Sequence, residues 1–174
     1  MEGRSARSGL LSKEQLKELI SMMRNLFRYH AELRERNPLG DLIQYPKIPP
    51  FLSESLVVLL IQSGFVSHIK NARLGNGRES DVLAESLAGE HLTVEVKATG
   101  VSAFMMLTEK DCDANYIFWL HFDDFFVNHE KSTIEVYSFQ PHKLGLKPNR
   151  IRVDQHLRQK FDRAPLDLVN FLNL

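Results

Sequence analysis

Residues 78–100 read RESDVLAESLAGEHLTVEVKATG, and this stretch decides how the rest of the chain is arranged. It predicts two short strands joined by a turn at Gly89, because residues typical of strands lie on both sides of a glycine-containing turn. Along the second strand the apolar side chains share one face, and Glu95 and Lys97 share the other. A carboxylate and an ammonium on one strand face are costly to bury unless they pair or take part in chemistry.

Asp81 stands at the head of the first strand and lies beside Glu95 if the two strands pair. Two carboxylates that converge next to a lysine can bind a hard cation such as Mg²⁺, which prefers oxygen ligands. The pattern therefore indicates a metal-dependent nuclease centre.

The order Asp81, connecting turn, Glu95-Val96-Lys97 resembles the Asp…Glu-x-Lys signature of the PD-(D/E)xK nuclease superfamily. That superfamily includes many type II restriction endonucleases and the archaeal Holliday-junction resolvases. Ser80 stands where the family has a nominal proline. The family pattern also has an upstream helix that carries a glutamate, and Glu54 at the start of an apolar run matches it. The resemblance covers about residues 53–122.

The resemblance implies an α/β fold of the restriction-endonuclease type, with a mixed central sheet of about five strands flanked by helices on both faces. It implies that Asp81, Glu95 and the backbone carbonyl of Val96 bind Mg²⁺, for which Mn²⁺ should substitute. Lys97 would orient the attacking water, stabilise developing negative charge or act as a base, and the sequence does not choose among these. Glu54 either supports the metal site or only favours the positive end of its helix.

Length and composition predict one ordinary domain over residues 1–174, with 43% hydrophobic and 25% charged residues. The net charge is zero, so any attraction for DNA must come from local charge asymmetry. The single Cys112 excludes an internal disulfide framework. Neither a secretory signal nor an apolar run of about 20 residues is present, which predicts a cytoplasmic protein without membrane contact.

Four helices are predicted, three of them around this centre and a last short one over residues 165–172. Ser12 and Gln15 form a capping-box signal for a helix over about 13–36, within an N-terminal helical segment of about 10–36. We expect Ser53 to cap a second, buried helix that ends at Gly64, although a buried strand is the competing assignment. Thr108 is expected to cap a short acidic helix before a central strand over residues 116–122.

Residues 141–163 carry seven basic residues against two acids, a local charge of +5 within a basic C-terminal segment of about 141–174. Such a flank suits the phosphate backbone of DNA, although a solvated basic face without a partner is the alternative. The candidate DNA contacts are Arg73 and Arg78 in the turn-rich loop before the site, and Lys143, Lys147, Arg150, Arg152, Arg158 and Lys160 in the basic segment.

Within the superfamily, the chain most resembles a small type II restriction endonuclease that cuts double-stranded DNA at a specific sequence. Cutting both strands suggests a homodimer joined through the first helix or the connector behind it. A cognate DNA methyltransferase acting on the same site is a further partner that this interpretation admits. The alternatives are a structure-selective nuclease such as a Holliday-junction resolvase, and a non-catalytic DNA-binding domain with a nuclease fold. The recognition sequence cannot be read from the chain.

Overall fold

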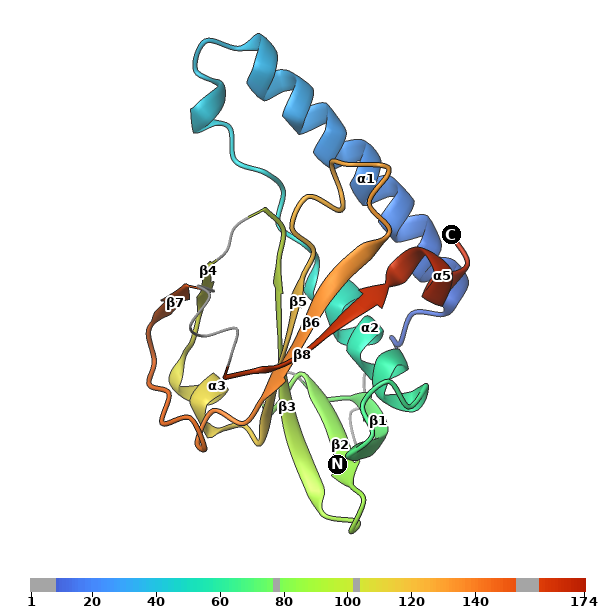
Figure 1. Ribbon diagram of the computed structural model, residues 1–174, viewed down its shortest axis with the longest axis vertical. Helices are drawn as coiled ribbons and strands as arrows, with labels where there is room; N and C mark the ends of the chain where they lie inside the picture. Colours follow the sequence, from blue (N-terminus) through green and yellow to red (C-terminus); the bar gives the residue numbers. More distant parts are fainter. Residues whose placement is uncertain (1–8, 77–78, 102–103, 153–159) are drawn as a thin grey trace, which may run out of the picture.

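The computed structural model describes residues 9–76, 79–101, 104–152 and 160–174 (Figure 1). Its helices are α1 (Lys13–Arg36), α2 (Pro50–Gln62), α3 (Glu109–Asp113) and α5 (Leu168–Leu172), with a 3-10 turn η1 (Gly40–Leu42). Its strands are β1 (Ile69–Leu74), β2 (Val82–Ser86), β3 (His91–Thr99), β4 (Phe104–Met106), β5 (Tyr116–His121), β6 (Thr133–Phe139), β7 (Arg150–Arg152) and β8 (Asp162–Asp167). The fold is therefore α/β, as expected.

The main sheet is mixed and has six strands in the order β1-β2-β3-β5-β6-β8. β3 and β5 run parallel, and every other neighbouring pair in this order runs antiparallel. The expected count of about five strands is therefore wrong, and β4 pairs with β7 in a separate small sheet. Strand β8 was not predicted because it contains Pro165 and three charged residues, Asp162, Arg163 and Asp167, which mask a strand pattern. It lies at the sheet edge, where a residue without an N–H is tolerated.

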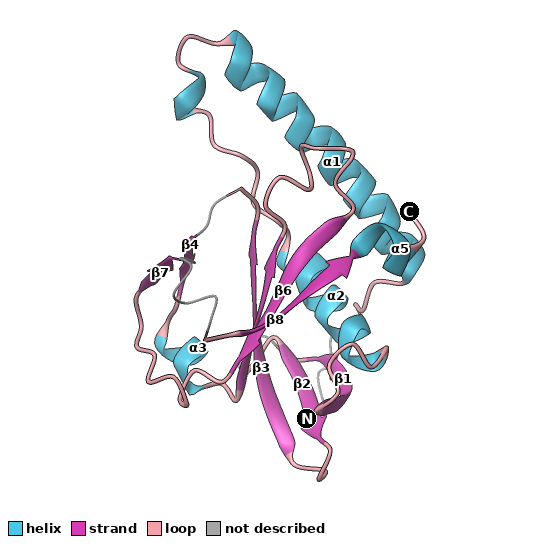
Figure 2. Ribbon diagram, viewed as in Figure 1, coloured by secondary structure: helices cyan, strands magenta, loops and turns pink. Residues whose placement is uncertain are grey.

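The two faces of the main sheet are covered by different elements (Figure 2). α1, α2 and α5 pack on the face that we call the helical face, over a core that includes Val82, Val94 and Phe118. On the opposite face, the small-sheet face, the β4–β7 sheet and its flanking segments pack on Trp119 and Tyr137. Side chains alternate along a strand, so Glu95 and Lys97 project from the small-sheet face.

Helix α1 confirms its predicted bounds and its capping box, because Ser12 accepts from the Gln15 amide and Gln15 accepts from the Ser12 amide. Its buried residues lie at helical spacing and face the core: Leu16, Ile20, Met23 and Phe27. Among the described residues, no helix is both long enough and apolar enough to cross a membrane.

Helix α2 is buried as predicted, but Ser53 does not cap it. The helix begins at Pro50, whose fixed φ suits a first helical position and whose missing N–H is no loss there. Ser53 lies inside the helix and donates to the Pro50 carbonyl at 2.9 Å. Gly64, with a φ of +77°, follows the helix and confirms the predicted end.

The hairpin of β2 and β3 forms as the sequence predicts, with Gly89 at a φ of +87° in its turn. Val82 pairs with Val94, and the antiparallel register continues along both strands. The β3 strand is one of the two central strands of the main sheet. The hairpin therefore carries its polar residues into the middle of the molecule.

Candidate active site

Asp81 and Glu95 face each other across the β2–β3 pair. Val82 pairs with Val94, so the next position of the register sets Asp81 opposite Glu95. The Val96 amide donates to Asp81 Oδ2 at 2.9 Å, where the carboxylate replaces the backbone partner that a longer β2 would supply. The structure thus brings together the two carboxylates that the sequence predicts.

The backbone before Asp81 is held by a close approach to Gly75. The Gly75 amide donates to the Asp81 carbonyl at 2.8 Å. A Cβ added at Gly75 would lie 2.2 Å from the Ser80 carbonyl oxygen, so only glycine fits without a backbone shift. Ser80 is completely buried beside it. This contact fixes the start of β2 and thereby the position of the Asp81 carboxylate.

Lys97 projects from the same face as Glu95, but its ammonium pairs with a different acid. Its Nζ lies 2.7 Å from Oδ1 of Asp111, which is only 1% exposed. Asp111 Oδ2 in turn accepts from the amide and the hydroxyl of Thr108 at 2.7 and 2.9 Å. The predicted Thr108 cap is confirmed, and it also fixes the carboxylate that holds Lys97.

Lys110 is the residue that the sequence interpretation missed. Its Nζ lies 2.9 Å from Glu95 Oε1 and 3.1 Å from Glu95 Oε2. The same ammonium lies 3.7 Å from Asp81 Oδ1, so it sits between the two carboxylates. Lys110 comes from α3, the crossover between the parallel strands β3 and β5. Nothing in the local sequence pattern signals this contact, because it depends on how α3 packs over β3.

The Glu95 carboxyl is electrostatically perturbed. Burial raises its pKa to about 7 from an ordinary value of 4.5; the hydrogen bond from Lys110 acts against this rise, and the charge of Asp81 adds to it. Burial acts to lower the pKa of Lys110, yet its hydrogen bond to Glu95 and the neighbouring negative charges raise that pKa overall. The site therefore favours a cation next to Glu95 once this carboxyl is ionised.

The two carboxylates fit a small hard cation, since they already share one positive charge, the Lys110 ammonium. The amide of Val96 points toward Asp81, and the carbonyl of a strand residue points to the same side as its amide. In the part of the chain that the structure describes, no group of three or more His, Cys, Asp or Glu side chains could hold a metal. Mg²⁺ commonly uses only one or two carboxylates and takes waters and phosphate oxygens for the rest.

Glu54 lies half-buried in the second turn of α2, so the expected first-turn placement is wrong. The dipole of a helix acts mainly within its first turn, which weakens the interpretation of Glu54 as a simple dipole residue. α2 packs on the helical face, whereas Glu95 projects from the small-sheet face. A supporting role for Glu54 at the metal stays a prediction.

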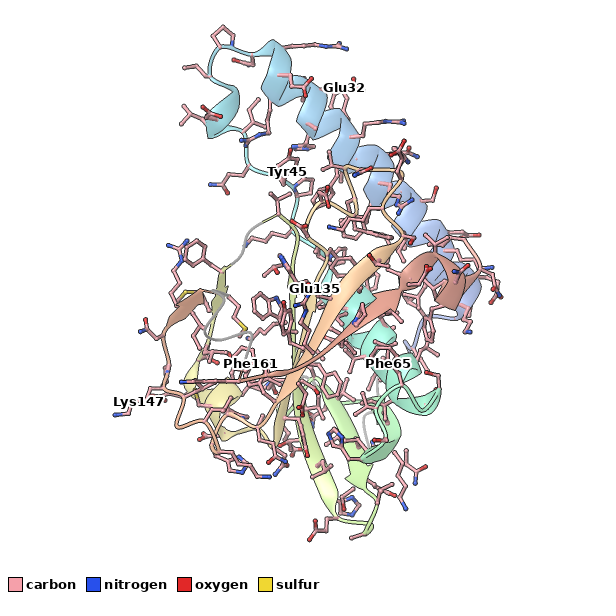
Figure 3. All side chains as sticks on the ribbon, viewed as in Figure 1. Glu32, Tyr45, Phe65, Glu135, Lys147 and Phe161 are labelled. Carbon is pink, nitrogen blue, oxygen red and sulfur yellow. The ribbon has the colours of Figure 1, made fainter. Side chains whose placement is uncertain are left out.

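Four of the predicted DNA contacts are exposed and lie in the basic segment. Lys143, Lys147, Arg150 and Lys160 are exposed in the segment whose apolar residues pack on the small-sheet face. Figure 3 shows Lys147 at the periphery of this side of the molecule. The Arg150 guanidinium lies 4.0 Å from the centre of the Phe104 ring, which links β7 to β4.

The other predicted DNA contacts lie in strand β1 or outside the described residues. Arg73 was expected in a loop but lies in strand β1, exposed and opposite Leu83. Arg78 and Arg158 lie outside the described residues, as does the side chain of Arg152 in β7.

A hollow of about 450 Å³ lies near the carboxyl ends of β3 and β5, lined in part by His121, Lys131, Glu135 and Arg163. Its cations already have acidic partners: Lys131 lies 2.6 Å from Asp123, and Arg163 bonds to Glu135. Arg163, counted in the basic segment, is therefore engaged within the protein.

We expect Glu95→Gln to change how stability depends on pH. The folded protein binds a proton at Glu95 more tightly than the unfolded chain, so the free energy of unfolding falls as pH rises from the ordinary pKa of 4.5 to about 7. Removing this titration should raise the stability of the variant relative to the wild type by up to about 3 kcal/mol between low and high pH. Urea unfolding of both proteins across this pH range, with a chelator present to remove metal ions, measures the difference in their free energies of unfolding.

Glu90→Gln provides the control, because Glu90 is an exposed glutamate of the same hairpin. The free energy of unfolding of Glu90→Gln should differ from that of the wild type by the same amount at every pH in this range. A constant offset for Glu95→Gln as well would show that Glu95 titrates normally in the folded protein.

If Asp81 and Glu95 bind Mg²⁺, Lys110→Met should strengthen this binding in the absence of DNA. A metal held by Asp81 and Glu95 must displace the Lys110 ammonium, and the variant removes this competitor. We expect an affinity about tenfold higher, or ~1.4 kcal/mol, by calorimetric titration at about pH 8. Lys147→Met, which removes an exposed lysine, should leave the affinity unchanged. Weaker binding by Lys110→Met would mean that Lys110 supports the metal instead of competing with it.

Comparison with known proteins finds no match for this chain. No protein-family model, no curated protein and no solved structure matches the chain. What the site does must be inferred from the positions of its own side chains.

Proposed function

We propose that this protein is a Mg²⁺-dependent DNA endonuclease that hydrolyses phosphodiester bonds. The observation that carries the proposal is the meeting of Asp81 and Glu95 at a single cation position, on the face from which Lys97 projects. A buried carboxyl with a pKa raised to about 7 is typical of a functional site, although structural ion pairs can produce the same shift.

Each residue of the cluster has a distinct task in this proposal. Asp81 and Glu95, with the carbonyl of Val96, hold the metal. When bound, the metal acidifies a water and neutralises charge on the scissile phosphate. Lys97 stands two residues beyond Glu95 on the same strand face, where its ammonium can stabilise negative charge that develops on the phosphate.

Asp111 acts as a positioning residue for Lys97. Its buried carboxylate is fixed by two hydrogen bonds from Thr108 and pairs with the Lys97 ammonium at 2.7 Å. A lysine side chain has several rotatable bonds, and this pair selects one of its many positions. Asp111 does not touch the metal position, so its contribution should be larger in the rate than in metal binding.

The basic residues suit the backbone of a DNA duplex. Lys143, Lys147, Arg150 and Lys160 are exposed in the segment that covers the small-sheet face, beside the strand that carries Glu95 and Lys97. Phosphate contacts of this kind orient DNA without reading its sequence. Sequence-specific cleavage, as in a type II restriction endonuclease, is the first form of activity to test because of the Asp81, Glu95 and Lys97 pattern.

The decisive measurement is incubation of the purified protein with plasmid DNA and Mg²⁺. Discrete fragments would indicate a restriction endonuclease, and cleavage restricted to four-way junctions would indicate a resolvase. Asp81→Asn and Lys97→Met should each slow cleavage by about 100-fold or more, with circular dichroism to verify that each variant is folded under the assay conditions. Asp124→Asn is the matched control, since Asp124 also pairs with a lysine, 2.5 Å from Lys131, in a loop beyond β5. DNA binding without any cleavage would contradict the nuclease proposal and support a non-catalytic DNA-binding domain.

Asp111→Asn should slow cleavage by about tenfold and change the affinity for Mg²⁺ by much less. The variant keeps the shape of the side chain but removes the charge that holds Lys97. Cleavage rates and calorimetric metal titrations together test this expectation. A parallel loss of metal affinity would show that Asp111 supports the metal ligands and not only the lysine.

A further inference from the structure

Helix α1 carries a second apolar stripe beside the one that faces the core. The stripe follows steps of three and four residues: Leu19, Met22, Leu26, Tyr29 and Leu33. Sustained steps of three and four are the spacing of residues along the seam of a coiled coil. The buried residues Leu16, Ile20, Met23 and Phe27 form an adjacent stripe on the core. Leu19 also packs partly on the core, so the uncovered part of the second stripe begins at Met22.

The middle of this seam is open. Met22 is 68% exposed, Leu26 43% and Tyr29 57%. Figure 1 shows α1 along one side of the molecule, with its C-terminal end and η1 reaching beyond the sheet. The connector behind α1 covers a different side of the helix, where Tyr45 stacks on Phe27. The exposed part of the seam is therefore accessible to another molecule.

The seam is nearly palindromic about Leu26. Leu19 and Leu33 stand seven residues before and after it, and Met22 and Tyr29 occupy the intermediate positions. Two such helices placed antiparallel, with a two-fold axis at Leu26, set Leu19 of each copy against Leu33 of the other. An isologous contact requires a surface that complements itself in this way.

The charges beside the seam favour the antiparallel direction. Glu18 and Arg36 lie five helical turns apart and hence on the same flank of the seam. They stand about 12 and about 15 Å from Leu26 along the helix, so each Glu18 approaches Arg36 of the other copy in an antiparallel pair. Arg36 also lies 3.5 Å from Glu32 of its own helix, and its exposed guanidinium would be shared between the two carboxylates. A parallel pair would instead leave each Glu18 about 27 Å along the helix axis from Arg36 of the other copy, so these charges could not pair.

Further exposed apolar residues lie at both ends of α1. Leu39 and Leu42 are exposed at the η1 end. At the other end Leu10 and Leu174 are exposed, and Leu174 and Met22 help to line a shallow hollow of about 580 Å³. An antiparallel pair brings the η1 end of each copy over this region of the other. A stable interface buries about 800 Å² per partner, so one helix seam alone is small and these ends add needed area.

We propose that two copies of the chain associate through an antiparallel α1–α1 contact centred on Leu26. The contact lies on the helical side of the main sheet, away from the small-sheet face that carries Glu95. It leaves both candidate active sites uncovered and relates them by a two-fold axis. The inference does not rest on nuclease activity, because it follows from α1 and the exposed apolar residues at its two ends.

Cysteine cross-linking tests the geometry. In a Cys112→Ser background, Leu26→Cys should form a disulfide-linked dimer under mild oxidation, since the two-fold axis brings the two thiols together. Glu18→Cys should not link to itself, because the two positions lie about 24 Å apart and a disulfide needs Cα atoms within roughly 7 Å. Glu35→Cys, exposed and off the seam, is the negative control. A linked Glu18→Cys dimer would overturn the antiparallel arrangement.

Sedimentation of the metal-free protein without DNA tests the association itself. The wild type should sediment as a dimer, and Leu26→Asp should be a monomer with an unchanged circular dichroism spectrum. Glu18→Arg should weaken the dimer by about tenfold, and adding Arg36→Glu should restore it. A monomeric wild type at about 100 μM, or a double variant no tighter than Glu18→Arg, would overturn the proposal, whether or not the protein cleaves DNA.

Discussion

The burial of the Glu95 carboxylate in the middle of the main sheet is the constraint on which the rest of the structure depends. Glu95 is only 3% exposed, and the effective cost of removing an ion from water is several kcal/mol unless a partner compensates it. Asp81 opposite it adds a second negative charge and increases the need for a cation. The Lys110 ammonium satisfies that need here, and a metal ion would satisfy it in the proposed enzyme.

The two faces of the sheet divide structural and chemical roles. The helical face buries the larger apolar cluster, with Leu56 of α2 and Phe118 of β5 among its fully buried residues. It provides the rigid support that a precise site requires. The small-sheet face has a smaller cluster around Trp119, and beside it stand Glu95 and Lys97. The segment with the exposed basic residues packs over the same face. These basic residues, Lys97 and the carboxylates of Asp81 and Glu95 therefore lie on one side of the sheet.

The sequence predicted what local patterns determine. Alternation along β3 placed Glu95 and Lys97 on one face, and the capping residues Ser12 and Thr108 marked the starts of α1 and α3. The predicted start of α2 at Ser53 was wrong. The helix begins at Pro50, because the fixed φ of proline suits the first helical position as well as a serine cap does.

The partners of the charged residues could not be predicted in this way. Lys110 and Asp111 meet Glu95 and Lys97 only because α3 folds back over β3, and the pairing joins residues that are 14 or 15 positions apart. No periodicity records such a contact. Strand β8 was not predicted for a related reason. Its place in the sheet is set by pairing with β6 and not by an alternation of apolar and polar residues of its own.

The position of Lys110 and Asp111 as consecutive residues on α3 has a thermodynamic consequence. Both ion pairs of the cluster are attached to one short helix anchored at Thr108, so a displacement of α3 that frees the carboxylates also changes the hold on Lys97. The occupancy of the cation position and the freedom of Lys97 are therefore linked equilibria, and each must bias the other by the same free energy. Substitutions in the two pairs should consequently be non-additive.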